Sequence, residues 1–566
     1  MSPPGISRRK LATALFLIIV PLLLLSPLAA FGFRDAADYV IAGSARLLGD
    51  LGFARLGIAP ALGGPELQRA IGLASPVTLL VHAILFAVLG DSPAPQLLAA
   101  LLLHLFIMGL TALVAYQWRP NRRTAAVAAL LVGLHPLAAG TVSGITPFGG
   151  MLAMFCVLSA VAYTMVVLRE GRFMPVVAVT LFAVLASIFD ASGLLVVPAV
   201  LLVSFLAPRN LEKVGWLRRL EPPVAVGIGV GATYIVARAV PDMFLSWQLL
   251  LAWQPRQLAE ATGWLLRALA WPALGDLSLG SRWLTPLLVA IPLAAVATIT
   301  VIRARRRPSV LVWPAIILAS LLPALLTLQP LRHDAPATAW AAFYPALAFF
   351  ALWIADLWPR PELRRTRIVL AILVAVVLIP QTAWIVQQRA ERARNIQRMG
   401  QDLSGLIAAV ADGTDIVVLA QANTTDLVEA AFLSAYYHGV ETRQVRFRML
   451  VDGWLALRES VAPSGQAVGK FARLPLYDRR QIIGLDAAHE HFVDLTSLVI
   501  AQAEIAQDIL NQDRRGPPPL ALADEATIRT WLDDRAKWRP AEPATAGWFV
   551  EGIMLRMHPH TGRMPM

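Results

Sequence analysis

Two carboxylates, Asp35 and Asp38, stand where the first hydrophobic segment of the chain ends. Residues three apart share one face if this turn is helical. A carboxylate at a membrane–water boundary could act as a base toward the hydroxyl of an acceptor. The alternative is a pair of solvated acids that simply ends a helix. Perturbed carboxylates often mark functional sites, so we take this pair as the starting point.

Further polar groups punctuate the apolar stretches later in the chain. Arg332, His333 and Asp334 lie between two late hydrophobic stretches, and Asp190 ends an earlier one. The guanidinium of Arg332 could form paired hydrogen bonds with a phosphate. Carboxylates at one edge and a guanidinium at another would suit an anionic, lipid-linked substrate. The alternative for the triplet is an ordinary charged surface turn.

Two histidines, His104 and His135, lie within or at the end of apolar runs. Ionisable residues inside a membrane are functional candidates by default. A structural role is the alternative for both. His104 could be a hydrogen-bonded contact between helices, and His135, which precedes Pro136, could mark the end of a helix.

The composition indicates that most of the chain is surrounded by lipid. Of 566 residues, 57% are hydrophobic and 15% are charged, and the mean hydropathy is +0.62. Soluble domains carry about 25% charged residues. The net charge of +12 comes from arginines clustered between apolar runs, which is the pattern of cytoplasmic loops. It therefore argues against a nucleic-acid partner. Cys156 is the one cysteine, so no internal disulfide can form.

The apolar runs predict an α-helical polytopic membrane protein with about 11 transmembrane helices. The expected spans are Leu11–Gly32, Gln96–Trp118, Thr124–Thr141, Phe148–Leu168, Arg172–Phe189, Ala191–Ala207, Pro222–Val240, Leu284–Ile302, Val310–Leu328, Ala337–Leu357 and Ile368–Val386. The basic flank Arg8-Arg9-Lys10 predicts a cytoplasmic N-terminus and an uncleaved first helix.

The apolar piece Val77–Leu89 decides the topology of the rest. It is short for a span and contains His82, which favours an interfacial helix. The later basic clusters follow every second span, so all of them lie on the same side of the membrane. Only if Val77–Leu89 does not cross is this also the cytoplasmic side, where the basic N-terminus lies. Residues 33–95 and 241–283 are then outer loops. Tryptophans in the second loop predict a helix over Trp247–Leu269 on the membrane surface, with a lipid-donor groove as the alternative.

The composition becomes that of a soluble domain near residue 400. Residues 1–386 form the expected membrane domain, 387–400 an extension of the last helix, and 401–566 a small extracytoplasmic α/β domain. The expected elements of this domain are strands at Asp415–Ala420, Val445–Val451 and Trp548–Met557, and helices at Asn423–Gly439 and Ala487–Asn511. Glycine spacing typical of dinucleotide or P-loop sites is absent.

The order of these features resembles a known family, and the resemblance covers roughly residues 1–385. It is carried by the acids at Phe33–Asp38, the segment Ser75-Pro76-Val77-Thr-Leu-Leu through Gly90, the run Leu101-Leu-Leu-His104, the run Ala128-Ala-Leu-Leu-Val-Gly-Leu-His135-Pro136 through Val142, and the late Leu321-Leu-Pro323, Arg332-His333 and Tyr344-Pro345. In this order they resemble the GT-C class of integral-membrane glycosyltransferases, especially the protein O-mannosyltransferases and their tetratricopeptide-bearing relatives.

The resemblance implies a transferase of the bacterial inner membrane. It would move a sugar, with inversion, from a polyprenyl-phosphate-linked donor to an extracytoplasmic glycan or protein acceptor. Asp35 would be the base, Asp38 its supporting acid, Arg332 the phosphate ligand and Asp190 a weaker fourth member; His333, His135 and His104 are the further substrate-binding candidates. Oxygen ligands suit Mg²⁺ or Mn²⁺, yet two neighbouring acids do not require a metal, and no cofactor is firmly expected.

Three departures from the family pattern support a second hypothesis. Where the family has an arginine before the loop proline, this chain has Ser75. Where the family has charged residues after the His-Pro span, this chain has the uncharged segment Thr146-Pro-Phe-Gly-Gly150. A later turn, Ser-Lys-Glu-like in the family, is Ser187-Ile-Phe-Asp190 here and keeps one acid, Asp190. The alternative function is therefore a catalytically inactive GT-C-like scaffold for an envelope assembly complex.

Overall fold

The fold is described from a computed structural model. It describes residues 8–30, 32–33, 35–51, 75–90, 92–208, 215–239, 262, 265, 269, 284–321, 343–358, 364–408, 415–419, 425–437, 446–450, 480–486 and 491–494. The chain forms two compact units, Met1–Ala393 and Arg394–Met566, which are described separately below.

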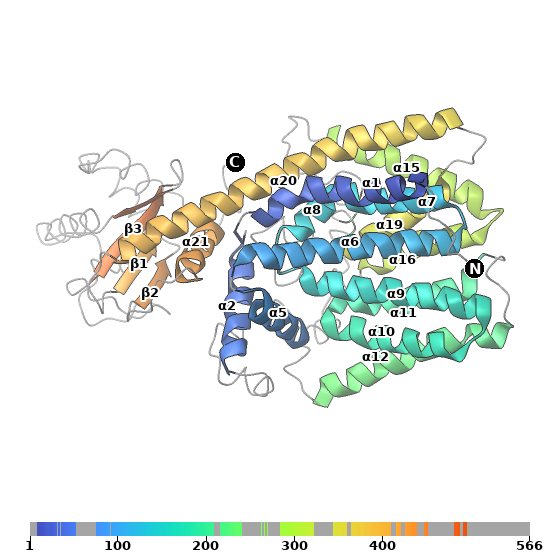
Figure 1. The fold of residues 1–566 in the computed structure, drawn as a ribbon, viewed down its shortest axis with the longest axis horizontal. Helices are drawn as coiled ribbons and strands as arrows, with labels where there is room; N and C mark the ends of the chain where they lie inside the picture. Colours follow the sequence, from blue (N-terminus) through green and yellow to red (C-terminus); the bar gives the residue numbers. More distant parts are fainter. Residues whose placement is uncertain are drawn as a thin grey trace, which may run out of the picture. The chain divides into compact units, whose positions relative to one another are not determined.

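The first unit is a bundle of helices (Figure 1). In chain order the α-helices are α1 (Arg8–Leu25), α2 (Ala36–Leu51), α5 (Pro76–Leu89), α6 (Pro93–Trp118), α7 (Arg122–Leu134), α8 (Pro136–Val142), α9 (Phe148–Glu170), α10 (Phe173–Phe189), α11 (Val196–Leu206), α12 (Glu221–Ala239), α15 (Leu284–Ala304), α16 (Val312–Ala319), α19 (Tyr344–Leu357) and α20 (Arg364–Ala408). Each of the eleven expected spans overlaps one or two of these helices, and parts of Val310–Leu328 and Ala337–Leu357 lie outside the described residues.

Among the described residues, α6 and α9 are each long and apolar enough to cross a bilayer. The bent pair α7 and α8 makes a third if it is counted as one span. At 1.5 Å per residue, the 26 residues of α6 extend about 39 Å, more than the hydrocarbon thickness of about 30 Å. These segments have the helix length and apolar composition expected of spans, and the count of eleven stays a prediction.

The outward face of α6 is apolar. Leu102, Phe106 and Leu113 are exposed, whereas Leu101, Ile107 and Met108 are buried in the bundle. α9 lies deeper and is buried along most of its length. A helix with large apolar side chains on both faces is typical of a protein core or a membrane span, and an apolar face left exposed indicates contact with lipid or a partner. This pattern supports a membrane environment for the bundle.

Helices α2 and α5 pack on each other at one end of the bundle (Figure 1). α5 has 14 residues and extends about 21 Å, too short to cross a bilayer. Ser75 caps it by accepting a hydrogen bond from the N–H of Thr78, and a proline opens the helix. Its length agrees with the predicted interfacial helix.

The chain breaks its helical path twice where the sequence carries a special residue. α7 ends at Leu134, and α8 begins at Pro136 with a bend of 54°. The hydroxyl of Thr382 donates to the carbonyl of Leu134, which the break leaves without its helical partner. Farther on, a Cβ at Gly193 would lie 1.9 Å from the carbonyl oxygen of Ala186. Only glycine permits this close approach after α10.

The second unit combines the C-terminal part of α20 with α21 (Thr425–Tyr437) and a four-stranded sheet. The sheet order is β2 (Arg446–Leu450), β1 (Asp415–Leu419), β3 (Arg480–Asp486), β4 (His491–Asp494); β1 is parallel to β2 and β3, and β4 is antiparallel to β3. Met399 and Leu403 of α20 pack with Val428, Ile483 and Phe492 in its core.

The expected strand and helix at 415–439 and the strand at 445–451 are present as β1, α21 and β2. The expected helix Ala487–Asn511 is wrong at its start, because residues 491–494 form β4 and pair with β3. The rest of that segment and the expected strand Trp548–Met557 lie outside the described residues.

Candidate active site

Asp38 lies in the first turn of α2 and is fully buried. Its Oδ1 atom accepts hydrogen bonds from the backbone N–H of Ile145, the backbone N–H of Thr146 and the Thr146 hydroxyl, at 2.9, 2.9 and 2.7 Å. These donors compensate the cost of burying the charge. The loop at residues 143–147, which joins α8 to α9, is thereby fixed to the start of α2. We call this arrangement the Asp38 clamp.

Asp35 immediately precedes α2, and its carbonyl accepts the N–H of Asp38 at 3.1 Å. Its carboxylate is 13% exposed, and Oδ1 lies 3.4 Å from Nη2 of Arg392, whose side chain is 41% exposed. Both the guanidinium and the N-terminus of α2 stabilise negative charge here. The two acids therefore have different environments: Asp38 is enclosed by its donors, and Asp35 lies at the rim.

Helix α5 adds polar groups beside the clamp. The Thr78 hydroxyl donates to the carbonyl of Phe189 at 2.8 Å and so connects α5 to the end of α10. His82, one turn later, is buried against the ring of Phe148, with centroids 5.1 Å apart. Burial lowers the pKa of His82 to about 4, and the backbone of Ile145 offsets part of this effect. The imidazole is therefore neutral at physiological pH.

Asp190 is placed beside this region through Phe189 and the start of α9. Its Oδ1 accepts the N–H of Ser192 at 2.7 Å and caps the short 3-10 helix Ala191–Leu195. Burial raises the pKa of Asp190, and the hydrogen bonds from Ser192 act in the opposite direction. A Cβ at Gly150 would lie 3.9 Å from the Asp190 carboxylate, so this acid faces α9. The contacts give Asp190 a capping role in the connection between α10 and α11.

The two intramembrane histidines make contacts within the bundle. His104 Nδ1 lies 2.7 Å from the hydroxyl of Tyr344, which joins α6 to α19. His135 Nδ1 accepts the N–H of Leu137 and caps α8, so its proton is on Nε2, which lies 3.0 Å from the carbonyl oxygen of Leu269. These contacts match the structural alternative for each histidine.

The other predicted residues lie outside the described part of the chain. These are Arg332, His333 and the surface helix expected over 247–269 apart from residues 262, 265 and 269. Within the described residues, no three His, Cys, Asp or Glu side chains are grouped as metal ligands. The placement of a metal near Asp35 is therefore not supported by a third acid or histidine in that part of the chain.

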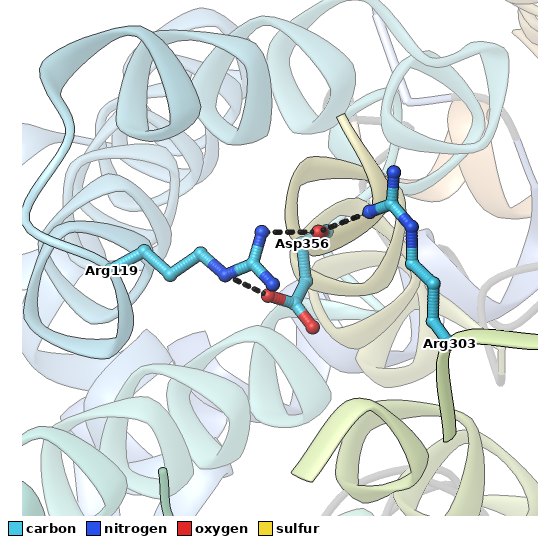
Figure 2. Close-up of polar contacts among 3 residues, drawn as sticks. All are labelled: Arg119, Arg303 and Asp356. Atoms are coloured by element: carbon cyan, nitrogen blue, oxygen red, sulfur yellow. Dashed lines mark hydrogen bonds and ion pairs between the residues drawn. The ribbon is translucent and has the colours of Figure 1, made fainter. Parts of the chain in front are cut away.

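A second charged cluster forms around Arg119, the residue that ends α6 (Figure 2). Asp356 of α19 is buried between two arginines. Nε of Arg119 lies 2.6 Å from Asp356 Oδ1, and guanidinium N–H groups of Arg119 and Arg303 donate to the Asp356 carbonyl at 2.7 and 3.2 Å. These contacts tie the ends of α6, α15 and α19 together, which indicates a structural role.

The sequence reasoning missed two residues of the site, Thr146 and Arg392. Thr146 stands among the positions that depart from the family pattern, yet its hydroxyl and N–H both hold Asp38. Arg392 lies in 387–400, the segment expected to extend the last helix. The spacing of Arg389 and Arg392, three residues apart on one helical face, is the one sequence signal that could have suggested a shared role.

The described residues form a helical bundle with a pair of carboxylates, Asp35 and Asp38, at the start of α2. Among solved structures, the chain is similar to ArnT from Cupriavidus metallidurans, in one structure bound to undecaprenyl phosphate and in another in the apo state. The identities are 14% and 15%, the TM-score is 0.46 in both, and the matches cover 84% and 85% of this chain and 94% of ArnT. No protein-family model and no curated protein matches the chain. We therefore base the functional proposal on the contacts described above.

Proposed function

We propose that the protein is a membrane glycosyltransferase that moves a sugar from a polyprenyl-phosphate donor to an extracytoplasmic acceptor. The observation that carries the proposal is the unequal pair of acids at the start of α2. Asp38 is fully buried and holds three hydrogen bonds, whereas Asp35 lies at the rim and is 13% exposed. A transferase of this class needs one carboxylate that can reach the acceptor and a rigid support for it.

In this proposal Asp35 is the general base. It takes the proton of the acceptor hydroxyl while the acceptor oxygen attacks the anomeric carbon from the face opposite the phosphate. The bond from that carbon to the phosphate oxygen breaks, and the electron pair leaves with the phosphate. Asp38 acts as a positioning residue, because the clamp fixes the turn that carries Asp35. Arg332 remains the proposed ligand of the leaving phosphate.

Mass spectrometry of lipids retained by the gently purified protein tests the donor. We expect a polyprenyl phosphate, or its glycosylated form, with the wild-type protein and its loss with Arg332→Ala. The retained sugar then defines the substrate for a transfer assay in proteoliposomes. There, Asp35→Asn should abolish transfer but keep the lipid, whereas Asp402→Asn, at an exposed acid of α20, should behave like the wild type. Full transfer by Asp35→Asn would refute the role of Asp35.

A catalytically inactive scaffold is the second candidate. The observation that favours it is that Ser75 and Thr146, two positions that depart from the family pattern, make structural hydrogen bonds: Ser75 caps α5, and Thr146 donates to Asp38. A scaffold would copurify with a stoichiometric envelope protein and would retain only bulk phospholipid. The lipid analysis above separates the two candidates directly.

A further inference from the structure

Helix α20 brings two guanidinium groups to the elements that build the site. Arg389 and Arg392 are three residues apart and share one face of the helix. Arg392 contacts Asp35 before α2. A Cβ at Gly140 in α8 would lie 3.9 Å from Nη2 of Arg389, so this arginine lies against the helix that leads into the Asp38 clamp.

The contact between Arg392 and Asp35 is suited to exchange. Its 3.4 Å separation exceeds the 2.7–2.9 Å of a tight charge-assisted hydrogen bond. The Arg392 side chain is 41% exposed, and partly solvated ion pairs contribute little to stability. A guanidinium presents five N–H donors in a planar fork that fits phosphate as well as carboxylate. A phosphate at this rim would therefore compete effectively with Asp35 for Arg392.

We infer that Arg392 exchanges between Asp35 and the phosphate of the lipid donor; this inference rests on the proposed function. In the resting protein Arg392 holds Asp35. When the donor binds, Arg392 moves to the phosphate, and Asp35 turns to the acceptor hydroxyl. Proton transfer to Asp35 and departure of the phosphate then proceed as described above, with Arg392 stabilising the charge that the phosphate gains. Arg389, one turn away, adds a second positive charge at the rim.

The first test measures binding of undecaprenyl phosphate to the full-length protein in nanodiscs of neutral lipid. Arg392→Gln should weaken binding about ten-fold or more, since it removes a charged hydrogen-bond donor, and Arg392→Lys should recover part of the loss. Arg398→Gln makes the same change at an exposed arginine of α20 and should leave the affinity unchanged. Two control ligands complete this test. Undecaprenol has the polyprenyl chain without the phosphate and measures recognition of the chain alone. Phosphatidylglycerol measures recognition of any anionic headgroup.

The second test uses the competition itself. Asp35→Asn removes the ion pair between Asp35 and Arg392 and should strengthen binding of undecaprenyl phosphate about two- to five-fold, the value of a partly exposed ion pair. This gain should disappear in the double variant Asp35→Asn/Arg392→Gln. A gain that persists there would come from lost repulsion by Asp35 alone, and it would overturn the exchange.

The outcomes distinguish this inference from the proposed function. If wild-type protein does not bind undecaprenyl phosphate, the proposed donor is wrong and the exchange with it. If the wild type binds and Arg392→Gln binds equally well, or if Arg392→Gln and Arg398→Gln are weakened to the same extent, only the exchange is wrong. Equal binding of phosphatidylglycerol and undecaprenyl phosphate at Arg392 would also overturn it.

Discussion

Replacing Asp38 with alanine removes the acceptor of three hydrogen bonds in the clamp. The N–H of Ile145 is then left buried and unpaired, at a cost of about 1–3 kcal/mol, and the N–H and hydroxyl of the partly exposed Thr146 lose a charged acceptor. Removing the buried charge recovers part of this cost. We expect Asp38→Ala to lower the free energy of unfolding by about 2–5 kcal/mol, and Asp38→Asn to lower it less because one oxygen acceptor remains.

The assay is unfolding in mixed micelles by increasing SDS, followed by tryptophan fluorescence. Thr146→Val removes only the hydroxyl donor and should cost about 1.5–3 kcal/mol. Combined with Asp38→Ala it should add almost nothing, because both changes delete the same bond. Gly144→Ala should also destabilise, since its Cβ would lie 2.8 Å from Oδ2 of Asp38. If Asp38→Ala stays within about 0.5 kcal/mol of the wild type, or if the two costs are additive, the clamp does not hold the loop as described.

Two further predictions concern other buried groups. Burial lowers the pKa of His82 from 6.5 to about 4 in the folded protein. Between these two pH values the unfolded chain therefore binds more protons than the folded one. We expect the free energy of unfolding to be unaffected by His82 above pH 6.5 and to fall by about 3 kcal/mol as the pH drops to 4. SDS unfolding at several pH values measures this decline, which His82→Phe should reduce; an unchanged pH dependence in that variant would contradict the assignment. Arg119→Ala should cost about 3–5 kcal/mol, because it leaves Asp356 buried without its closest guanidinium. The double variant with Asp356→Asn should recover much of that loss, and failure of this rescue would show that Arg119 contributes through packing instead.

The sequence was sufficient to predict elements that depend on local composition. Apolar runs predicted the positions of helices, and the short run beginning at Val77 forms a helix of 14 residues, as its length indicated. The break between α7 and α8 falls inside the single span expected over Thr124–Thr141 and matches the alternative given for His135, a helix end before Pro136. These features follow from the hydrophobic period and from the missing N–H of proline, which act within a few residues.

Contacts between distant elements could not be predicted in this way. In the sequence, Thr146 is 108 residues from Asp38. Asp35 and Arg392 lie near opposite ends of the segment Met1–Ala393 that forms the first unit. Such pairs depend on how whole helices pack, which no local pattern records. The helix expected from Ala487 failed for a related reason: residues 491–494 pair with β3, and that pairing overrides local helix preference.

The cluster around Asp356 has a consequence for the way this chain is made. Arg119 and Arg303 are synthesised before the acid that they hold: Asp356 follows Arg119 by 237 residues and Arg303 by 53. During that interval both arginines remain charged and unneutralised by Asp356, in the state in which basic residues retain a loop on the cytoplasmic side. We expect both arginines to act first as topological signals and then, once Asp356 is synthesised, as its partners. A variant lacking Asp356 should therefore still insert correctly while failing to close this end of the bundle.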